Sequence, residues 1–293
     1  MRITTRIVIT LSAALACTSS PSAGRGAQPP QSAQGGRQGG GGGFKQPEPI
    51  DFNEHDGWTS LFDGKTLNGW SGDASWHVEN GAITIESTCE RPTGTVYLVW
   101  KGGEAADFEL KLEMKGTGNI NGGVQYRGWI APKPPRRGGP AAGRGGQTGP
   151  CPSGAARGTP PSDESEAQWN MWGAQYDFDA ANRYTGQFYE QSTGRGIVAW
   201  KGQAVRTLPG DVRRLVATLG DPASVEAIYK PNDWNQLHII AIGNQLTHLL
   251  NGRVIAILID ADTHRVPKSG IIGLEVEATG QLSARNIWLK KLQ

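Results

Sequence analysis

The sequence predicts an all-β domain, a sandwich or jelly roll of two antiparallel sheets. Apolar and polar residues alternate over several short runs, which is the pattern of half-buried strands. Turn signals recur roughly every ten residues between these runs, and no amphipathic helix of useful length is indicated. The length of residues 51–293 fits one such domain rather than two.

An export signal precedes this domain. The apolar run 7–16 follows two arginines and is too short to span a bilayer as a helix, so residues 1–16 are a predicted signal peptide. Two fates stay open for the mature chain: ordinary cleavage after Ala16, or lipidation of Cys17 as in a bacterial lipoprotein. Either fate places the protein outside the cytoplasm, in the periplasm, anchored to the outer membrane or secreted. Only a lipid at Cys17 would join it to a membrane.

Two low-complexity segments flank or interrupt the domain. Residues 17–50 are mostly Gly, Gln, Ser, Pro and Arg, which predicts a disordered linker. Residues 131–167 have a similar composition, and so long a loop inside a compact domain is uncommon. We expect a disordered insertion near the rim of the functional site. The formal net charge of +2 provides no broad basic field, so no nucleic-acid partner is expected.

The remaining chain divides into short strands. Asp-Gly and Asn-Gly turns precede the run 82–86, residues 96–100 are apolar, and residues 108–114 alternate most cleanly between apolar and charged side chains. After the insertion, an Asn-Gly dipeptide at 251–252 joins two runs as a strong hairpin signature. The strands expected in this second half are 234–242, 246–250, 253–260, 270–277 and 285–292.

The stretch 169–198 around which the other strands are arranged carries the main functional signal. Its alternation places Tyr176 and Phe178 on one face, and the polar residues Gln175, Asp177 and Asp179 on the other. Such a strand is half-buried, and its polar face is available to bind a polar ligand.

A second strand, 121–129, shows the same division. Gln125, Arg127 and Trp129 alternate with apolar side chains, so we expect them to share the polar face of Gln175 and Asp177. Aromatic rings beside amides and carboxylates suit sugars, because sugar C–H faces stack on rings while hydroxyls bond to planar polar groups. The alternative is an ordinary solvated sheet face.

Several familiar site types are missing from the sequence. It has no CxxC pair, no HExxH, no phosphate-binding glycine loop that opens a helix, and no G-x-S-x-G elbow. The histidines are scattered, so their spacing indicates no metal cluster. No cofactor is indicated with certainty, a divalent cation stays open, and the sequence gives no oligomeric state.

Seven motifs in order resemble a known family, the 3-keto-disaccharide hydrolase domain. They are LFDGKTLNGW, WHVENGAIT, DFELKLEMK, NGGVQYR, QYDFD with YTGQFYE and GRGI, WNQLHIIAIGNQLTHLLNG, and SGIIGLEVE with ARNIWLKKL. The resemblance covers Asp56 to Leu292 apart from the insertion. It implies the concanavalin A-like lectin/glucanase fold, a jelly roll.

The resemblance also implies a reaction, the cleavage of glycosides oxidised at C3 of the sugar. A C3 ketone acidifies the C2 proton, so a carboxylate or His base can remove it while the C1 substituent leaves, with water added afterwards. Direct hydrolysis by two carboxylates stays open as a second route. A non-catalytic carbohydrate-binding module is the alternative function, because the same fold serves lectins. An interaction protein, whose Gly/Arg-rich segments matter more than its sheet, is a third.

The candidate site residues follow from the motifs and the alternation. The catalytic candidates are Asp177, Glu190 and His248. His248 shares a strand face with Leu246 and Leu250, so a core histidine is an equal alternative. The expected substrate-binding residues are Gln125, Arg127, Trp129, Gln175, Tyr189, Arg195, Glu275 and Glu277. Many family members carry an amide and a histidine where Glu275 and Glu277 stand.

The cysteines predict one disulfide. Cys17 is removed or lipidated in two of its possible fates, which leaves Cys89 and Cys151 in an oxidising compartment. Neither lies in a predicted core strand that would prevent their approach.

Overall fold

The computed structural model describes residues 45–132, 169–262 and 267–292. Residues Pro49–Gln293 form one compact unit, and only the last few residues of the preceding unit, Met1–Glu48, are described. The predicted signal peptide, the lipidation site and nearly all of the predicted linker and insertion lie outside the described residues. Cys89 is disulfide-bonded, and its expected partner Cys151 lies outside them as well.

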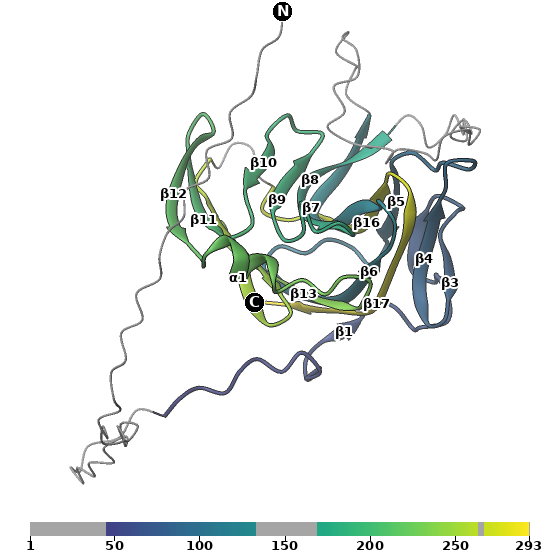
Figure 1. Cartoon of the computed structure of the whole chain (residues 1–293), viewed down its shortest axis with the longest axis horizontal. Helices are drawn as coiled ribbons and strands as arrows, with labels where there is room; N and C mark the ends of the chain where they lie inside the picture. The colour runs from purple at the N-terminus through teal and green to yellow at the C-terminus, as the bar shows by residue number, and fades with distance from the viewer. Residues whose placement is uncertain (1–44, 133–168, 263–266, 293) are drawn as a thin grey trace, which may run out of the picture. The chain divides into compact units, whose positions relative to one another are not determined.

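Two sheets make up the unit, which confirms the predicted all-β sandwich (Figure 1). The larger sheet has ten strands and the smaller one seven. In sheet order, the larger contains β12 (Val212–Thr218), β11 (Gln203–Leu208), β15 (Arg253–Asp260), β14 (Gln245–Leu250), β13 (Asn235–Ile242), β6 (Phe108–Gly116), β17 (Gly280–Lys291), β4 (Ala82–Ser87) and β3 (His77–Glu79), with β1 (Thr59–Ser60) paired to β17. The smaller contains β10 (Gly196–Ala199), β9 (Phe188–Gln191), β8 (Trp169–Asp179), β7 (Asn121–Pro132), β16 (Ile271–Glu277), β5 (Val96–Trp100) and β2 (Trp70–Gly72).

The pairing departs from the expected pattern at one place. β11 and β15 run parallel, whereas the other described pairs are antiparallel, so the larger sheet is mixed. A five-residue helix, α1 (Pro222–Glu226), follows β12. Asp221 caps it by accepting from the Ser224 amide, and Pro222 occupies its first turn, where no amide donor is needed. Within the described residues, no helix reaches the length and apolar character that crossing a membrane requires.

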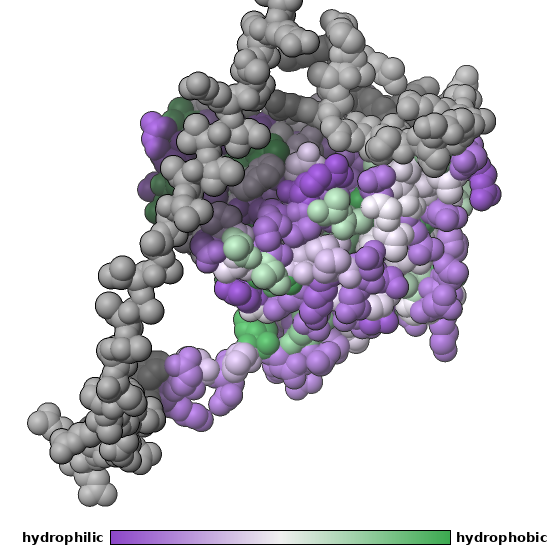
Figure 2. Space-filling view, viewed as in Figure 1, coloured by the Kyte–Doolittle hydropathy of each residue, from purple (hydrophilic) through white to green (hydrophobic). Residues whose placement is uncertain are grey.

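The core lies between the two sheets. On β6, the apolar residues Phe108, Leu110, Leu112 and Met114 all point inward and are fully buried, as their alternation predicts. The smaller sheet contributes Tyr176 and its neighbours from the facing layer. Burial of each large apolar side chain stabilises the fold by about 1.5–3 kcal/mol. The face of the described residues that is visible in Figure 2 is mostly hydrophilic, with scattered apolar residues.

Candidate active site

The candidate site lies on the outer face of the seven-stranded sheet, the side opposite the core. On β7 and β8, Val124 and Tyr176 point into the core and are paired across the strands. Gln125 and Gln175 form the adjacent pair. Because successive side chains of a strand point to opposite faces, these two amides point outward. The shared face of these two amides agrees with the alternation in both strands.

Two carboxylates flank a glycine on this face. Gly123 of β7 is paired with Asp177 of β8 on one side and with Glu275 of β16 on the other. Because Gly123 has no side chain, nothing from β7 separates the two carboxylates in this row. A Cβ at Gly123 would lie 2.2 Å from the backbone oxygen of Tyr176, so the backbone itself requires glycine here.

Amide donors hold both carboxylates. Gln175 Nε2 donates to Glu275 Oε2 at 2.5 Å, and Gln187 Nε2 donates to Asp177. Gln191 Nε2 donates to Tyr97 Oη at 2.9 Å and lies 3.4 Å from Glu275 Oε1. These bonds fix the carboxylate orientation without supplying a positive charge.

The next row of the face adds a third carboxylate. Glu277 is paired with Asn121, whose Nδ2 donates to Glu277 Oε1 at 2.9 Å. Glu277 is two residues from Glu275 on the same strand, so both side chains point outward. Three carboxylates, Asp177, Glu275 and Glu277, thus share one sheet face.

Burial and mutual repulsion raise the pKa values of this cluster. Loss of solvent, then the charge of Glu277, raises the pKa of Glu275 well above its usual range, and burial does the same for the pKa of Asp177. Neither carboxylate forms an ion pair with a described Lys, Arg or His side chain. The raised pKa values favour the protonated form, so the cluster can supply a carboxylic acid beside a carboxylate.

The amide of Gln125 is buried without a partner. The side chain is 0% exposed, and neither its oxygen nor its nitrogen has a hydrogen-bond partner among the described residues. Leaving a buried polar group unpaired costs on the order of 1–3 kcal/mol. An unpaired amide beside Gln175 and the two carboxylates is a group that a polar ligand would satisfy.

Arg127 does not lie on this face, so its predicted place is wrong. Its φ of +47° and the register shift between Tyr126 and Trp129 form a bulge, which reverses the alternation. Its guanidinium bonds to Ala106 O and Gly243 O at 2.7 Å each and to Asp107 at 3.0 Å, at the end of the ten-stranded sheet. Arg127 thus ties the two sheets together.

Trp129 leaves the outer face for the same reason. It follows the bulge and pairs with Trp172, whose neighbour Met171 packs on the outer face with Tyr97 and Val99. Because successive side chains of a strand point to opposite sides, Trp172 and its partner Trp129 lie on the other side of the sheet.

Glu190 and Arg195 also lie away from Asp177, contrary to prediction. Glu190 is paired with Ala174, a core-facing residue, whereas Tyr189 is paired with Gln175 on the outer face. Arg195 Nη1 contacts Glu190 Oε1 at 2.5 Å and Asp260 Oδ2 at 2.7 Å, and its Nε contacts Asp211. Burial raises the pKa of Glu190, with Arg195 opposing the rise. This buried network joins the two sheets.

His248 is a core histidine. Its ring stacks on Phe188 at 3.6 Å, Nδ1 donates to Gly186 O at 3.0 Å, and Nε2 lies 2.8 Å from Tyr126 Oη, which therefore donates to it. Burial lowers the pKa of His248 to about 3. The ring is neutral, and both of its nitrogens are hydrogen-bonded inside the sandwich, so it cannot act as a base on the outer face. His248 therefore has the structural role in the core that the sequence left open.

Sequence reasoning missed four residues of the outer face: Tyr97, Asn121, Gln187 and Gln191. Tyr97 lies in an apolar run, and burial together with the charge of Glu275 raises its pKa. A tyrosine among the apolar residues of this strand was its only available signal. Among the described residues, no group of three or more His, Cys, Asp or Glu side chains is arranged to hold a metal ion.

Most of the chain matches one known domain family. The 3-keto-alpha-glucoside-1,2-lyase-like domain matches residues 57–290. No curated protein matches the chain.

Several solved structures are similar. A candidate glycosyl hydrolase from Parabacteroides distasonis ATCC 8503 is 14% identical, with a TM-score of 0.44, covering 81% of this chain and 95% of that one. The carbohydrate-binding module CBM66 from Bacillus subtilis is 14% identical, with a TM-score of 0.41, covering 76% and 96%. A Bacillus subtilis protein of unknown function with a galectin-like fold is 13% identical, with a TM-score of 0.43, covering 77% and 90%.

Proposed function

This chain belongs to the 3-keto-alpha-glucoside-1,2-lyase-like domain family, and we propose that it is an exported enzyme that cleaves 3-keto-glucosides. The site is the outer face of the seven-stranded sheet. The observation that carries the proposal is the pair of carboxyl groups, Asp177 and Glu275, on either side of Gly123 and without a described cation.

The reaction we propose begins at C2 of the oxidised sugar. The C3 ketone acidifies the C2 proton, a carboxylate removes it, and the electron pair forms the C1–C2 double bond as the C1–O bond breaks. The leaving oxygen takes a proton from a carboxylic acid. Addition of water to the double bond would then complete a net hydrolysis, so elimination and a hydrolase activity are compatible.

The outer face offers both proton-transfer partners. We assign Asp177 as the base, because Gln187 donates to its carboxylate and stabilises the ionised form. We assign Glu275 as the acid, because the neighbouring Glu277 and Asp177 favour its protonated form. The raised pKa of Glu275 supports its role as the acid, since a general acid must hold its proton near the working pH.

The amides have a binding role in this proposal. Gln125 has no partner among the described residues and lies in the same row as Gln175. Its amide nitrogen can donate to a sugar oxygen such as the C3 carbonyl, which would stabilise the negative charge that develops there during proton removal. Export from the cytoplasm, inferred from residues 1–16, would bring this face to extracellular carbohydrate.

The same face argues against a binding module alone. A module needs an aromatic platform, whereas the described outer-face residues present carboxyl and amide groups with the phenols Tyr97 and Tyr189. Three buried carboxylates would repel one another at no benefit to simple sugar binding.

Release of nitrophenol from p-nitrophenyl 3-keto-α-D-glucoside tests the proposal, with p-nitrophenyl α-D-glucoside as the unoxidised control. We expect turnover of the keto substrate alone. Asp177→Asn and Glu275→Gln should each reduce kcat on the order of a hundredfold or more, and Gln125→Ala, which removes a donor to the charge that develops on the C3 oxygen, should reduce kcat as well. Equal cleavage of both substrates, or full activity in both carboxylate variants with native circular dichroism, would refute it.

A further inference from the structure

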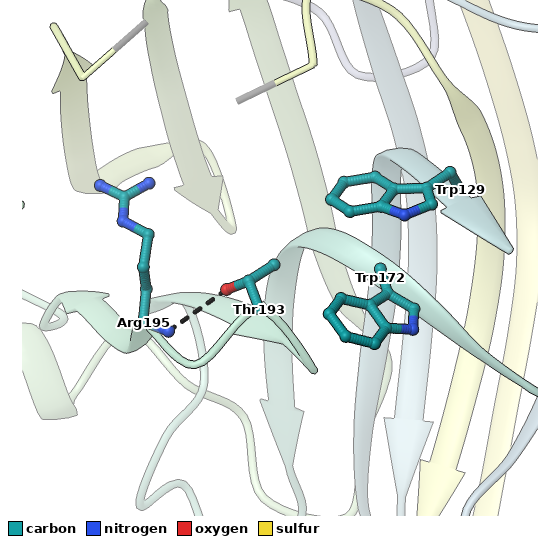
Figure 3. A pocket seen from close by; sticks show the side chains of 4 residues that line it. All are labelled: Trp129, Trp172, Thr193 and Arg195. Carbon is teal, nitrogen blue, oxygen red and sulfur yellow. Dashed lines mark hydrogen bonds between the residues drawn. The ribbon is translucent and has the colours of Figure 1, made fainter. Parts of the chain in front are cut away.

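A separate pocket lies at the far ends of β7 and β8. Trp129, Trp172, Thr193 and Arg195 line a cavity of about 200 Å³ (Figure 3). In Figure 3, the two indoles lie one above the other, with Thr193 between them and the Arg195 side chain. Because Trp172 points to the side opposite Met171, this pocket is distinct from the outer face.

The fold holds the two indoles in place. Trp129 and Trp172 are paired across the strands, with ring centroids 6.1 Å apart and planes 31° apart. Trp172 Nε1 donates to Pro132 O at 3.2 Å, which fixes its orientation. Both side chains are only partly buried, and neither belongs to a core cluster formed by the described residues. Core packing therefore does not account for this pair.

The bulge on β7 accounts for where the indoles point. Arg127 reverses the alternation, and Gly173 faces it on β8 with a φ of +125°. A Cβ at Gly173 would lie 2.9 Å from Gly128 Cα, so the two backbones approach more closely than another residue allows. The anchored bulge thus turns Trp129 to the side on which the regular alternation of β8 already places Trp172.

The opposite wall is rigid and carries no net positive charge. Thr193 Oγ1 donates to Glu190 Oε2 at 2.7 Å and accepts from the Arg195 amide at 3.2 Å. The Arg195 guanidinium is already paired with Glu190, Asp260 and Asp211. An anionic ligand would thus find a neutralised arginine among carboxylates, which favours a neutral polar ligand.

One polar atom nearby has no partner. Asn170 lies two residues from Trp172 on the same side of β8, and its Nδ2 donates to Ser192 Oγ at 2.9 Å. Its Oδ1 is buried without a hydrogen-bond partner among the described residues. A small shift of this side chain would present an acceptor to a hydroxyl group beside the indoles.

We propose that this pocket binds a single pyranose ring, as a carbohydrate subsite separate from the reacting face. Indole faces stack on sugar C–H groups, and the neutral wall suits hydroxyls. Its volume lies below the about 300–1,000 Å³ of sites for larger ligands, which limits the occupant to one ring. The proposal rests on the proposed function in that carbohydrate is the ligand class of both sites. Such a subsite would hold the protein on an oligosaccharide while the outer face acts.

Binding of maltohexaose and cellohexaose to the full mature chain tests this subsite, by titration calorimetry in an Asp177→Asn background that suppresses turnover. Trp172→Ala should weaken binding at least tenfold, and Trp172→Phe should restore much of it. Trp200→Ala is the matched control: this indole is 39% exposed but packs on Tyr184 outside the pocket, so its loss should leave binding unchanged.

Two results would overturn the subsite. One is the absence of binding of either hexasaccharide at millimolar concentration, and the other is equal affinity of Trp172→Ala and its parent. Nitrophenol release by the chain with Asp177 intact is measured separately. Binding that depends on Trp172, without any turnover, would support the subsite and refute the proposed enzymatic function. Turnover without binding that depends on Trp172 would support the enzymatic function and refute the subsite.

Discussion

Asp177→Asn should stabilise the protein at neutral pH while reducing its kcat on the order of a hundredfold or more. The pKa of this carboxyl group is higher in the folded state than in the unfolded state. Below the unfolded pKa of about 4 the group is protonated in both states, and its contribution to stability is fully present there. As the pH rises through the folded pKa, the unfolded state releases its proton more readily and stability is lost. Asparagine keeps an acceptor for Gln187 and never ionises, so it avoids this loss.

The expected size follows from the sheet geometry. Asp177 and Glu275 are separated by one intervening strand, which places them about 10 Å apart at two strand spacings. At an effective dielectric constant of about 20, two like charges at that distance would repel by about 1.7 kcal/mol. Holding one proton on Glu275, as proposed above, avoids this repulsion but costs a comparable free energy of folding above the unfolded pKa, and asparagine at position 177 removes either cost. Desolvation of the Asp177 carboxylate adds to this, so we expect about 2 kcal/mol of stabilisation. For a domain of this size, that corresponds to a Tm increase of about 4–8 °C.

Thermal unfolding followed by circular dichroism at pH 4, 6 and 8 measures the effect. The Tm difference between Asp177→Asn and wild type should be near zero at pH 4 and grow toward pH 8. Asp179→Asn is the matched control, because Asp179 is buried on the same strand but paired with Arg183 at 2.8 Å. It should lower the Tm at pH 8. An Asp177→Asn variant that is less stable than wild type at pH 8 would refute the reasoning.

Three further outcomes are expected. Because the pKa of His248 falls from 6.5 to about 3 on folding, wild type should lose stability as the pH drops from 6.5 toward 3, and His248→Leu should show a flatter urea-unfolding profile there. Arg195→Met leaves Glu190 and Asp260 unpaired and should cost about 3–5 kcal/mol in urea unfolding, against almost nothing for the exposed Arg214→Met. A thiol count on the unreduced, denatured mature protein should find no reactive Cys89, and a reactive one would contradict its disulfide.

The sequence predicted those features that follow from simple alternation. The buried face of β6 and the outward direction of Gln125, Gln175 and Asp177 all depend on the two-residue period of strands, and the structure has them. Glu275, which was expected to bind substrate, shares this face with Asp177.

What alternation could not predict is the bulge at Arg127. One residue with positive φ reverses the direction of every later side chain, while the pattern of apolar and polar residues stays unchanged. This is why Arg127 and Trp129 were assigned to the wrong face. The inward direction of Glu190 has a different cause, since its strand alternates regularly but places the carboxylate inside the sandwich, where the guanidinium of Arg195 makes its burial tolerable.

Deuterium at C2 of the substrate gives the most direct test of the central claim, that the outer face removes this proton. Wild-type protein is incubated in ordinary water with p-nitrophenyl 3-keto-α-D-glucoside labelled with deuterium at C2, and the sugar product is examined by NMR against an enzyme-free control for spontaneous exchange. The account predicts that nitrophenol release is accompanied by loss of the C2 deuterium, and that Asp177→Asn slows both together. Release of nitrophenol with the C2 deuterium fully retained in the product would contradict it.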